Sequence, residues 1–283
     1  MKKLLFFFSL VLLSLNAQAQ AQIQTPQPSP AAELHQTVGL TKVVVKYSRP
    51  SAKDRAIFGE LVPYNELWRL GANASTKISF DKDVEINGNA VPKGEYALYA
   101  IPQKDKWTLV VHKNLKHWGT GYGKEKYKQE EDLFRVDIPV KSAQPHTESF
   151  TIEFANFQND GADLTFAWAE TVATASIKVK TEEQVEASIA KAFDPKSKAN
   201  DYFNASRFYY ESDKDLNQAA SWMAEAVTLR PEAYWYHALN AKILAKLGKN
   251  AEAKKAAEKS IELAEKAGNQ DYVRMNTELI NSL

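Results

Sequence analysis

The sequence predicts a two-domain protein of the β + α class: an antiparallel β-sandwich or open barrel, followed by an all-α domain of tetratricopeptide-like helical repeats. From Leu34 to Lys180, apolar and polar residues alternate with the period of two that is typical of strands. From Thr181 onward, apolar residues recur with the spacing of helices. The 283 residues are enough for two domains of ordinary size.

The first 19 residues are predicted to be a signal peptide. Lys2 and Lys3 form a basic region, and a mostly apolar stretch of twelve residues runs from Leu4 to Leu15. Ala17 and Ala19 supply the small residues that a signal peptidase needs. Twelve residues are too few to cross a bilayer of about 30 Å as a helix, so no membrane span is expected after cleavage. The chain has no cysteine, which excludes lipid attachment at an N-terminal cysteine and disulfides. We expect an exported protein, periplasmic or secreted, and not a lipoprotein.

Residues 20–33 are rich in Gln and Pro and predict a flexible linker before the β domain of residues 34–180. Two turn dipeptides, Asn87-Gly88 and Asp160-Gly161, predict tight reversals between strands. Short apolar patterns with turn-rich connections and no intervening helix favour a sandwich or open barrel. The strands are expected near residues 43–47, 78–86, 96–101, 107–111, 133–140, 149–154, 164–168 and 174–179.

Residues 181–283 are predicted to form the helical domain. Thr181 and Gln184 have the spacing of a capping box, and Asp194-Pro195 ends the first helix. An internal repeat follows, since Ala219, Met223, Ala226 and Pro231 are matched 34 residues later by Ala253, Ala257, Ser260 and Glu265. This is the period of tetratricopeptide repeats, in which small residues let paired helices approach closely. A free-standing array needs about three copies, so we expect the first helix, a final helix over Tyr272–Leu283 and contact with the β domain to complete the fold.

The β domain contains several ordered motifs: Tyr47 to Ser51, Ile57 to Tyr64, Leu67 to Asn73, Pro92 to Tyr96, Trp118-Gly119 and the strand entry from Asp132 to Val136. Together these motifs resemble an exported bacterial family of domains of unknown function, DUF2911. The resemblance covers about Leu34–Lys180, and it implies that a helical tail of repeat type often follows such a domain. It supports the domain boundary and assigns no activity, ligand or catalytic residue.

Composition excludes several classes of function. The chain carries 36 basic and 35 acidic residues, so it has no electrostatic footprint for nucleic acid. The chain lacks the nucleophile-elbow motif of serine hydrolases and the His-Glu-x-x-His zinc motif. It also lacks a phosphate loop, because Gly123-Lys124 is followed by Glu125 and the first glycine of that motif is missing at its required spacing. His112 and His117 lie five residues apart with no nearby Glu ligand. The sequence therefore predicts no metal and no cofactor, while paired carboxylates for glycoside cleavage stay open.

Arg49, Arg69 and Asn73 are candidate ligand-binding residues outside regular strands. Each guanidinium offers a planar fork that can hold a carboxylate or phosphate, which makes this an anion-recognition corner. The alternative is structural: Arg69 pairs with Asp132 or Glu66 and pins a long loop. We expect the structural alternative for Arg69.

The segment from His112 to Glu130 provides further candidate ligand residues: His117, Trp118 and Tyr122. Its glycines permit a mobile loop, and aromatic faces stack on sugar rings or cations. A small sugar or anion is the ligand that this composition would suit. The same residues are equally compatible with a surface loop held down by its aromatics.

Aromatic residues concentrate on the first helices of the predicted repeats. Such residues are the usual anchors of protein–protein binding hot spots. The alternative is that they seal the helices against the β domain. The candidate partner-binding residues are Tyr202, Tyr209, Tyr210, Tyr234 and Trp235, with Phe203 and Tyr236 beside them.

These observations predict an exported, non-catalytic binding or scaffold protein of the bacterial cell envelope that holds a protein partner with its helical repeats. The alternative function is a periplasmic hydrolase or isomerase acting on a carbohydrate or anionic metabolite near Arg69 and Trp118. A deep pocket that joins Arg69, Asn73 and Trp118 with two or more carboxylates would favour the enzyme. A shallow surface would favour the binding protein.

Overall fold

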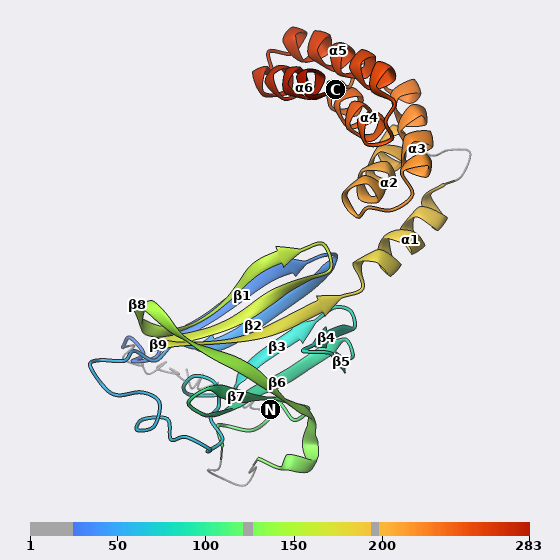
Figure 1. The fold of residues 1–283 in the computed structure, drawn as a ribbon. Helices are drawn as coiled ribbons and strands as arrows, with labels where there is room; N and C mark the ends of the chain where they lie inside the picture. Colours follow the sequence, from blue (N-terminus) through green and yellow to red (C-terminus); the bar gives the residue numbers. More distant parts are fainter. Residues whose placement is uncertain (1–24, 121–126, 194–197) are drawn as a thin grey trace, which may run out of the picture.

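Nine strands precede six α-helices in the described residues 25–120, 127–193 and 198–283 of this computed structural model (Figure 1). This arrangement confirms a β domain followed by a helical domain. The strands are β1 (Ala31–Val38), β2 (Thr41–Ser48), β3 (Thr76–Phe80), β4 (Val84–Ile86), β5 (Asn89–Val91), β6 (Gly94–Pro102), β7 (Lys106–His112), β8 (Asp132–Gln158) and β9 (Gly161–Val179). The helices are α1 (Thr181–Ala192), α2 (Ala199–Glu211), α3 (Leu216–Leu229), α4 (Tyr234–Lys246), α5 (Asn250–Lys266) and α6 (Gln270–Ser282).

The named strands pair antiparallel in the order β1-β2-β3-β6-β7-β8-β9-β4-β5. The 27-residue β8 joins two sheets, because residues 132–139 pair with β7 and residues 140–158 pair with β9. One apolar core lies between the sheets, and Trp107, Trp168 and Phe150 are among its largest fully buried side chains. On β2, Val43, Val45 and Tyr47 face this core, as the period of two predicts.

The two predicted turn dipeptides are both chain reversals. Asn87 and Gly88 connect β4 to β5 with positive φ values of 46° and 78°, the backbone of a type I′ turn. Asp160-Gly161 lies where β8 returns as β9. The Asn87-Gly88 reversal needs few residues because these two residue types readily adopt the left-handed backbone.

Two pairs of predicted strands turn out to be single long strands. The segments 133–140 and 149–154 both belong to β8, and 164–168 and 174–179 both belong to β9. The pairing register shifts between Ser142 and Thr147, where Pro145 has no N–H for the ladder. Ala169, opposite Thr147, has a φ of 51° and bends β9. The chain therefore bends at these points and does not reverse. The first strand, β1, also begins at Ala31, within the predicted linker.

The helical domain is built of helix pairs. Helix α3 packs on α2, α5 packs on α4, and α6 completes the row, so α2, α4 and α6 follow one another along one face. All six small or apolar positions of the 34-residue repeat are fully buried, which confirms paired helices at that spacing: Ala219, Met223, Ala226, Ala253, Ala257 and Ser260. The predicted capping box is wrong. Thr181 is already inside α1, and Gln184 instead accepts a hydrogen bond from Lys82.

Helix α1 connects the two domains (Figure 1). Toward the β domain, Lys82 Nζ donates to Gln184 Oε1 at 2.5 Å. Toward the other helices, Glu186 accepts from Lys214 Nζ at 2.9 Å and from the Tyr209 hydroxyl at 3.0 Å. Ion pairing with Glu182 and Glu186 raises the pKa of Lys214. The predicted contact between the domains therefore runs through α1.

The described residues contain no helix that combines the length and apolar character needed to cross a membrane. The predicted signal peptide and the helix end at Asp194-Pro195 lie outside those residues.

The turn between β1 and β2 packs closely on the start of α1, and this contact is testable at Gly39. A Cβ at Gly39 would lie 2.0 Å from Thr181 Oγ1 and 2.8 Å from the Asn159 carbonyl oxygen, while Gly88 has nothing within 4 Å. Both glycines have positive φ, so alanine at either position costs about 1–2 kcal/mol. We expect Gly39→Ala to lower the free energy of unfolding by about 1–3 kcal/mol more than Gly88→Ala, through overpacking. Urea denaturation of the two variants measures this difference, and equal losses would contradict it.

Candidate functional site

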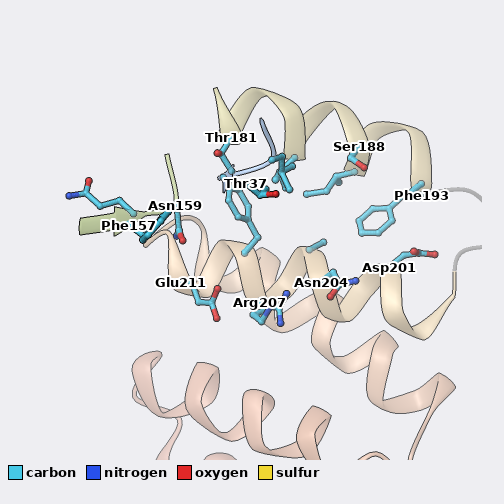
Figure 2. Close-up of a pocket in the computed structure, with 18 residues that line it drawn as sticks. Thr37, Phe157, Asn159, Thr181, Ser188, Phe193, Asp201, Asn204, Arg207 and Glu211 are labelled. Carbon is cyan, nitrogen blue, oxygen red and sulfur yellow. The ribbon is translucent and has the colours of Figure 1, made fainter. Parts of the chain in front are cut away.

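A cavity of about 570 Å³ lies at the junction of the two domains. Figure 2 shows it between α1 and α2, with Thr37, Phe157 and Asn159 of the strand tips at one end and Phe193 at the other. Its α1 side is largely apolar, whereas α2 contributes polar side chains that include Asp201 and Arg207. This cavity separates the helical repeats from the strand tips, so the repeats keep a surface of their own.

A second cavity, of about 220 Å³, forms a groove along α2, α4 and α6, which we call the helical groove. The first helix of each pair faces it, together with the last helix. Its lining is mainly aromatic and basic: Phe203, Arg207, Tyr210, Trp235, Lys242, Tyr272 and Met275, with Glu211, Ala238 and Leu239.

Two cations of the helical groove have no ion pair in the described part of the chain. The Arg207 guanidinium carbon lies 5.6 Å from the centre of the Phe203 ring. Lys242 Nζ lies 3.7 Å from Met275 Sδ, which is only a weak acceptor. With two cations and one carboxylate, Glu211, in its lining, the groove carries a net positive charge between aromatic faces.

The predicted partner-binding residues divide between this groove and the interior of the helical domain. Tyr210 and Trp235 line the groove, and Tyr234 packs at 4.8 Å on Tyr272, which also lines it. Tyr202 and Tyr209 face away from it. Tyr202 stacks on Phe193 of the α1 end at 4.9 Å, and Tyr209 packs on Trp222 at 4.7 Å. The aromatics thus hold the helices to one another, and the strands take no part in these ring contacts.

A third cavity, of about 430 Å³, contains part of the predicted anion-recognition corner. Arg69 and Asn73 line it, but Trp118 does not, and none of its lining residues is acidic. Arg49 is committed to structure, since its Nε donates to the Phe150 carbonyl at 3.1 Å and its Nη2 to Thr151 Oγ1 at 2.7 Å. The deep pocket with carboxylates that would favour an enzyme is not formed by these residues.

The expected ion pair of Arg69 with Asp132 or Glu66 is wrong for the described residues. Arg69 Nη1 instead donates to the Asn73 backbone carbonyl at 2.8 Å, across the loop that it was expected to pin. Gly119 packs directly on its guanidinium, because a Cβ there would lie 2.7 Å from Arg69 Cζ. Arg69 does hold its loop together, but through a backbone carbonyl.

Asp132 has other partners, in a buried cluster at the end of β7. It receives hydrogen bonds from Arg135 Nε at 2.7 Å, from the Tyr127 hydroxyl at 2.6 Å and from His112 Nδ1 at 2.8 Å. Burial and the hydrogen bond to Asp132 raise the pKa of Tyr127. The three contacts hold the Asp132 carboxylate in place at the start of β8.

The predicted loop residues separate in the structure. Trp118 is 63% exposed, His117 is buried beside the Asp132 cluster, and Tyr122 lies outside the described residues. Hydrogen bonds with Asn114 and His117 hold the pKa of Glu131 below its usual range. No Glu ligand was predicted from the sequence near the two histidines. In the structure, the antiparallel pairing of β7 with β8 sets His112 opposite Asp132, and this pairing brings Glu131 beside His112 and His117. This proximity could have been predicted from the sequence, because the strands expected at 107–111 and 133–140 are consecutive, and pairing them brings the two ends of the connecting segment together.

Comparison with known proteins identifies the β domain. The sequence profile of the family described as "Protein of unknown function (DUF2911)" matches residues 29–177, more than half of the chain. No curated protein matches the chain. The solution structure of protein BPP2914 from Bordetella parapertussis is similar with 22% identity and a TM-score of 0.31, over 35% of this chain and 84% of that one. A similarity at that level indicates neither a shared fold nor a shared function.

The role of Arg69 as a loop pin predicts a moderate stability effect. Arg69→Ala removes one charged hydrogen bond to a backbone carbonyl at a partly exposed position, so we expect the free energy of unfolding to fall by about 1–2 kcal/mol. Arg69→Lys, which keeps the charge, serves as the control for a purely electrostatic effect. Urea denaturation decides the matter. A loss of about 3–5 kcal/mol, typical of a broken buried ion pair, would contradict the loop-pin role.

Proposed function

The chain belongs to the DUF2911 family, and we propose that this member is an exported, non-catalytic binding protein of the bacterial cell envelope whose tetratricopeptide-like helical repeats hold a protein partner. The single observation that carries the proposal is the helical groove, with its aromatic lining and its two cations that have no ion pair among the described residues. Tyr, Trp and Arg are the residue types that most often dominate binding energy at protein interfaces.

The charge of the groove favours a partner segment with carboxylates. Arg207 lines both the helical groove and the junction cavity, and Lys242 lies across the helical groove on α4. Each would gain a charge-assisted hydrogen bond from an acidic side chain or a chain terminus. Phe203, Tyr210 and Trp235 supply apolar faces beside these charges. An extended acidic peptide, or a C-terminal carboxylate with an apolar residue before it, matches this lining.

The alternative function, a hydrolase or isomerase at the Arg69 region, lacks a comparable observation. Acid–base chemistry on a sugar or an anionic metabolite needs positioned carboxylates or other proton carriers. The cavity beside Arg69 has no acidic lining residue, and Trp118 lies outside it. The cavity beside Arg69 therefore gives no support to this alternative.

Charge reversal in the groove tests the proposal. We expect the double variant Arg207→Glu and Lys242→Glu to bind an envelope partner, and free-acid acidic peptides, at least about 10-fold more weakly, because a like charge would face the partner's carboxylates. The matched control is Lys254→Glu, on the exposed outer side of α5. Fluorescence anisotropy with peptides carrying either a C-terminal acid or an amide measures the effect. Equal loss in the control, or no loss in the double variant, would contradict a role for the groove.

Export generates a separate prediction. Cleavage after Ala19 gives a mature protein that begins at Gln20, so mass spectrometry of the protein from the periplasm or medium should find that N-terminus. Deleting residues 2–19 should leave the protein in the cytoplasm. A wild-type protein that stays in the cytoplasm at full length would overturn the export part of the proposal.

A further inference from the structure

Two histidines and a glutamate converge at the end of β7, far in sequence from the helical groove. His112 is the last residue of β7, His117 lies in the loop that follows, and Glu131 is the last residue of the short 3-10 helix Gln129–Glu131 before β8. One ligand atom from each residue can be chosen so that all three lie within 4.8 Å of one another. Two imidazoles and a carboxylate form a common ligand set for Zn²⁺ in proteins.

The contact with Asp132 fixes the orientation of the His112 ring. Its Nδ1 lies 2.8 Å from Asp132 Oδ1, and Asp132 also accepts hydrogen bonds from Tyr127 and Arg135. An ionised carboxylate only accepts, so Nδ1 of His112 carries the proton. In the neutral ring, the lone pair is then on Nε2, which points toward Glu131. A carboxylate behind a histidine is the usual outer partner of a metal-binding imidazole.

His112 Nε2 is a buried polar atom without a hydrogen-bond partner in the described part of the chain. Its side chain is fully buried, and Glu131 Oε2 lies 3.6 Å away, too far for a hydrogen bond. A lone pair facing a carboxylate oxygen across this gap is repelled, and buried polar atoms are otherwise almost always paired. A cation between the two atoms would turn this repulsion into attraction.

The two distances that involve Glu131 are close to the edges of a zinc tetrahedron. With Zn–N and Zn–O bonds of about 2.0–2.1 Å, two ligand atoms of a tetrahedral site lie about 3.3–3.4 Å apart. Glu131 Oε2 lies 3.3 Å from His117 Nε2 and 3.6 Å from His112 Nε2. Asn114 Nδ2 donates to the same Glu131 oxygen at 2.9 Å and so holds the carboxylate in place. The Glu131 oxygen therefore already lies near zinc-ligand spacing from both imidazoles, and all three ligand atoms lie within 4.8 Å of one another.

We propose that His112 Nε2, His117 Nε2 and Glu131 Oε2 bind one Zn²⁺, with a fourth position open to solvent. The two histidine side chains are 0% and 2% exposed, whereas that of Glu131 is 31% exposed. Solvent therefore reaches the ion from the Glu131 side. Three protein ligands with one open position are the arrangement that lets zinc hold a water molecule or an external ligand.

Zinc alone is the probe for the test. The purified full chain, stripped with a chelator, should bind one equivalent of Zn²⁺ by isothermal titration calorimetry and retain it through dialysis, measured by elemental analysis. Glu131→Gln and His117→Asn should each weaken binding at least 100-fold. The matched control is His146→Asn, because His146 is exposed and lies 2.7 Å from Glu170 and 3.4 Å from Glu148 without being part of the site. It should bind zinc as the wild type does.

Cobalt spectroscopy of the wild-type protein gives a second test, which does not depend on whether the variants fold. Co²⁺ added to the stripped wild-type protein should give the intense visible absorption of four- or five-coordinate cobalt, and Zn²⁺ should displace it. The proposal is overturned if the wild type binds no zinc, if Glu131→Gln binds zinc as tightly as the wild type, or if His146→Asn abolishes binding. A weak six-coordinate cobalt spectrum would overturn it as well, whether or not a variant folds.

Discussion

The pairing of β8 with two different neighbours is the constraint on which the rest of the structure depends. Its first residues complete the sheet that ends in β7, and its later residues pair with β9, which leads directly into α1. One strand therefore closes the core, sets Asp132 opposite His112 and determines where the helices begin. The hydrogen bonds from the Arg49 side chain to Phe150 and Thr151 hold the same strand against the end of β2. A shift in its register would displace all of these features together.

Much of the fold could be predicted because the signals are local or periodic. Alternation identified the core face of β2, and Asn87-Gly88 identified a hairpin whose backbone only such residues adopt readily. The repeat positions Ala219 and Ala253 were predicted from spacing alone, and both are fully buried. In each case the information lies within a few residues or in a fixed period, so no knowledge of distant pairing is needed.

The features that could not be predicted depend on pairing across long stretches of chain. Sequence gives no sign that β8 continues through Pro145, because a proline and a polar segment normally indicate a turn. Arg69 was expected to find a carboxylate, yet Asp132 already has three donors of its own. Glu131 comes beside His112 only through the register of β7 and β8. In the helical domain, the place of Arg207 in the groove depends on the packing of α2 against α4, which no local pattern reports.

The order of the strands leaves β1 and β5 at the two ends of the sheet, and this affects how the molecule behaves in concentrated solution. An exposed strand edge is a template on which a second chain can add a strand. Here β5 has only three residues, and β1 alternates exposed and half-buried residues along most of its length. Glu33 and His35 place charged or ionisable groups on β1, and Lys46 of β2 lies 3.6 Å from Glu33. A short edge strand at one end and a polar edge strand at the other disfavour aggregation by strand addition. The aromatic residues of the helical groove lie on the other domain, away from both edges.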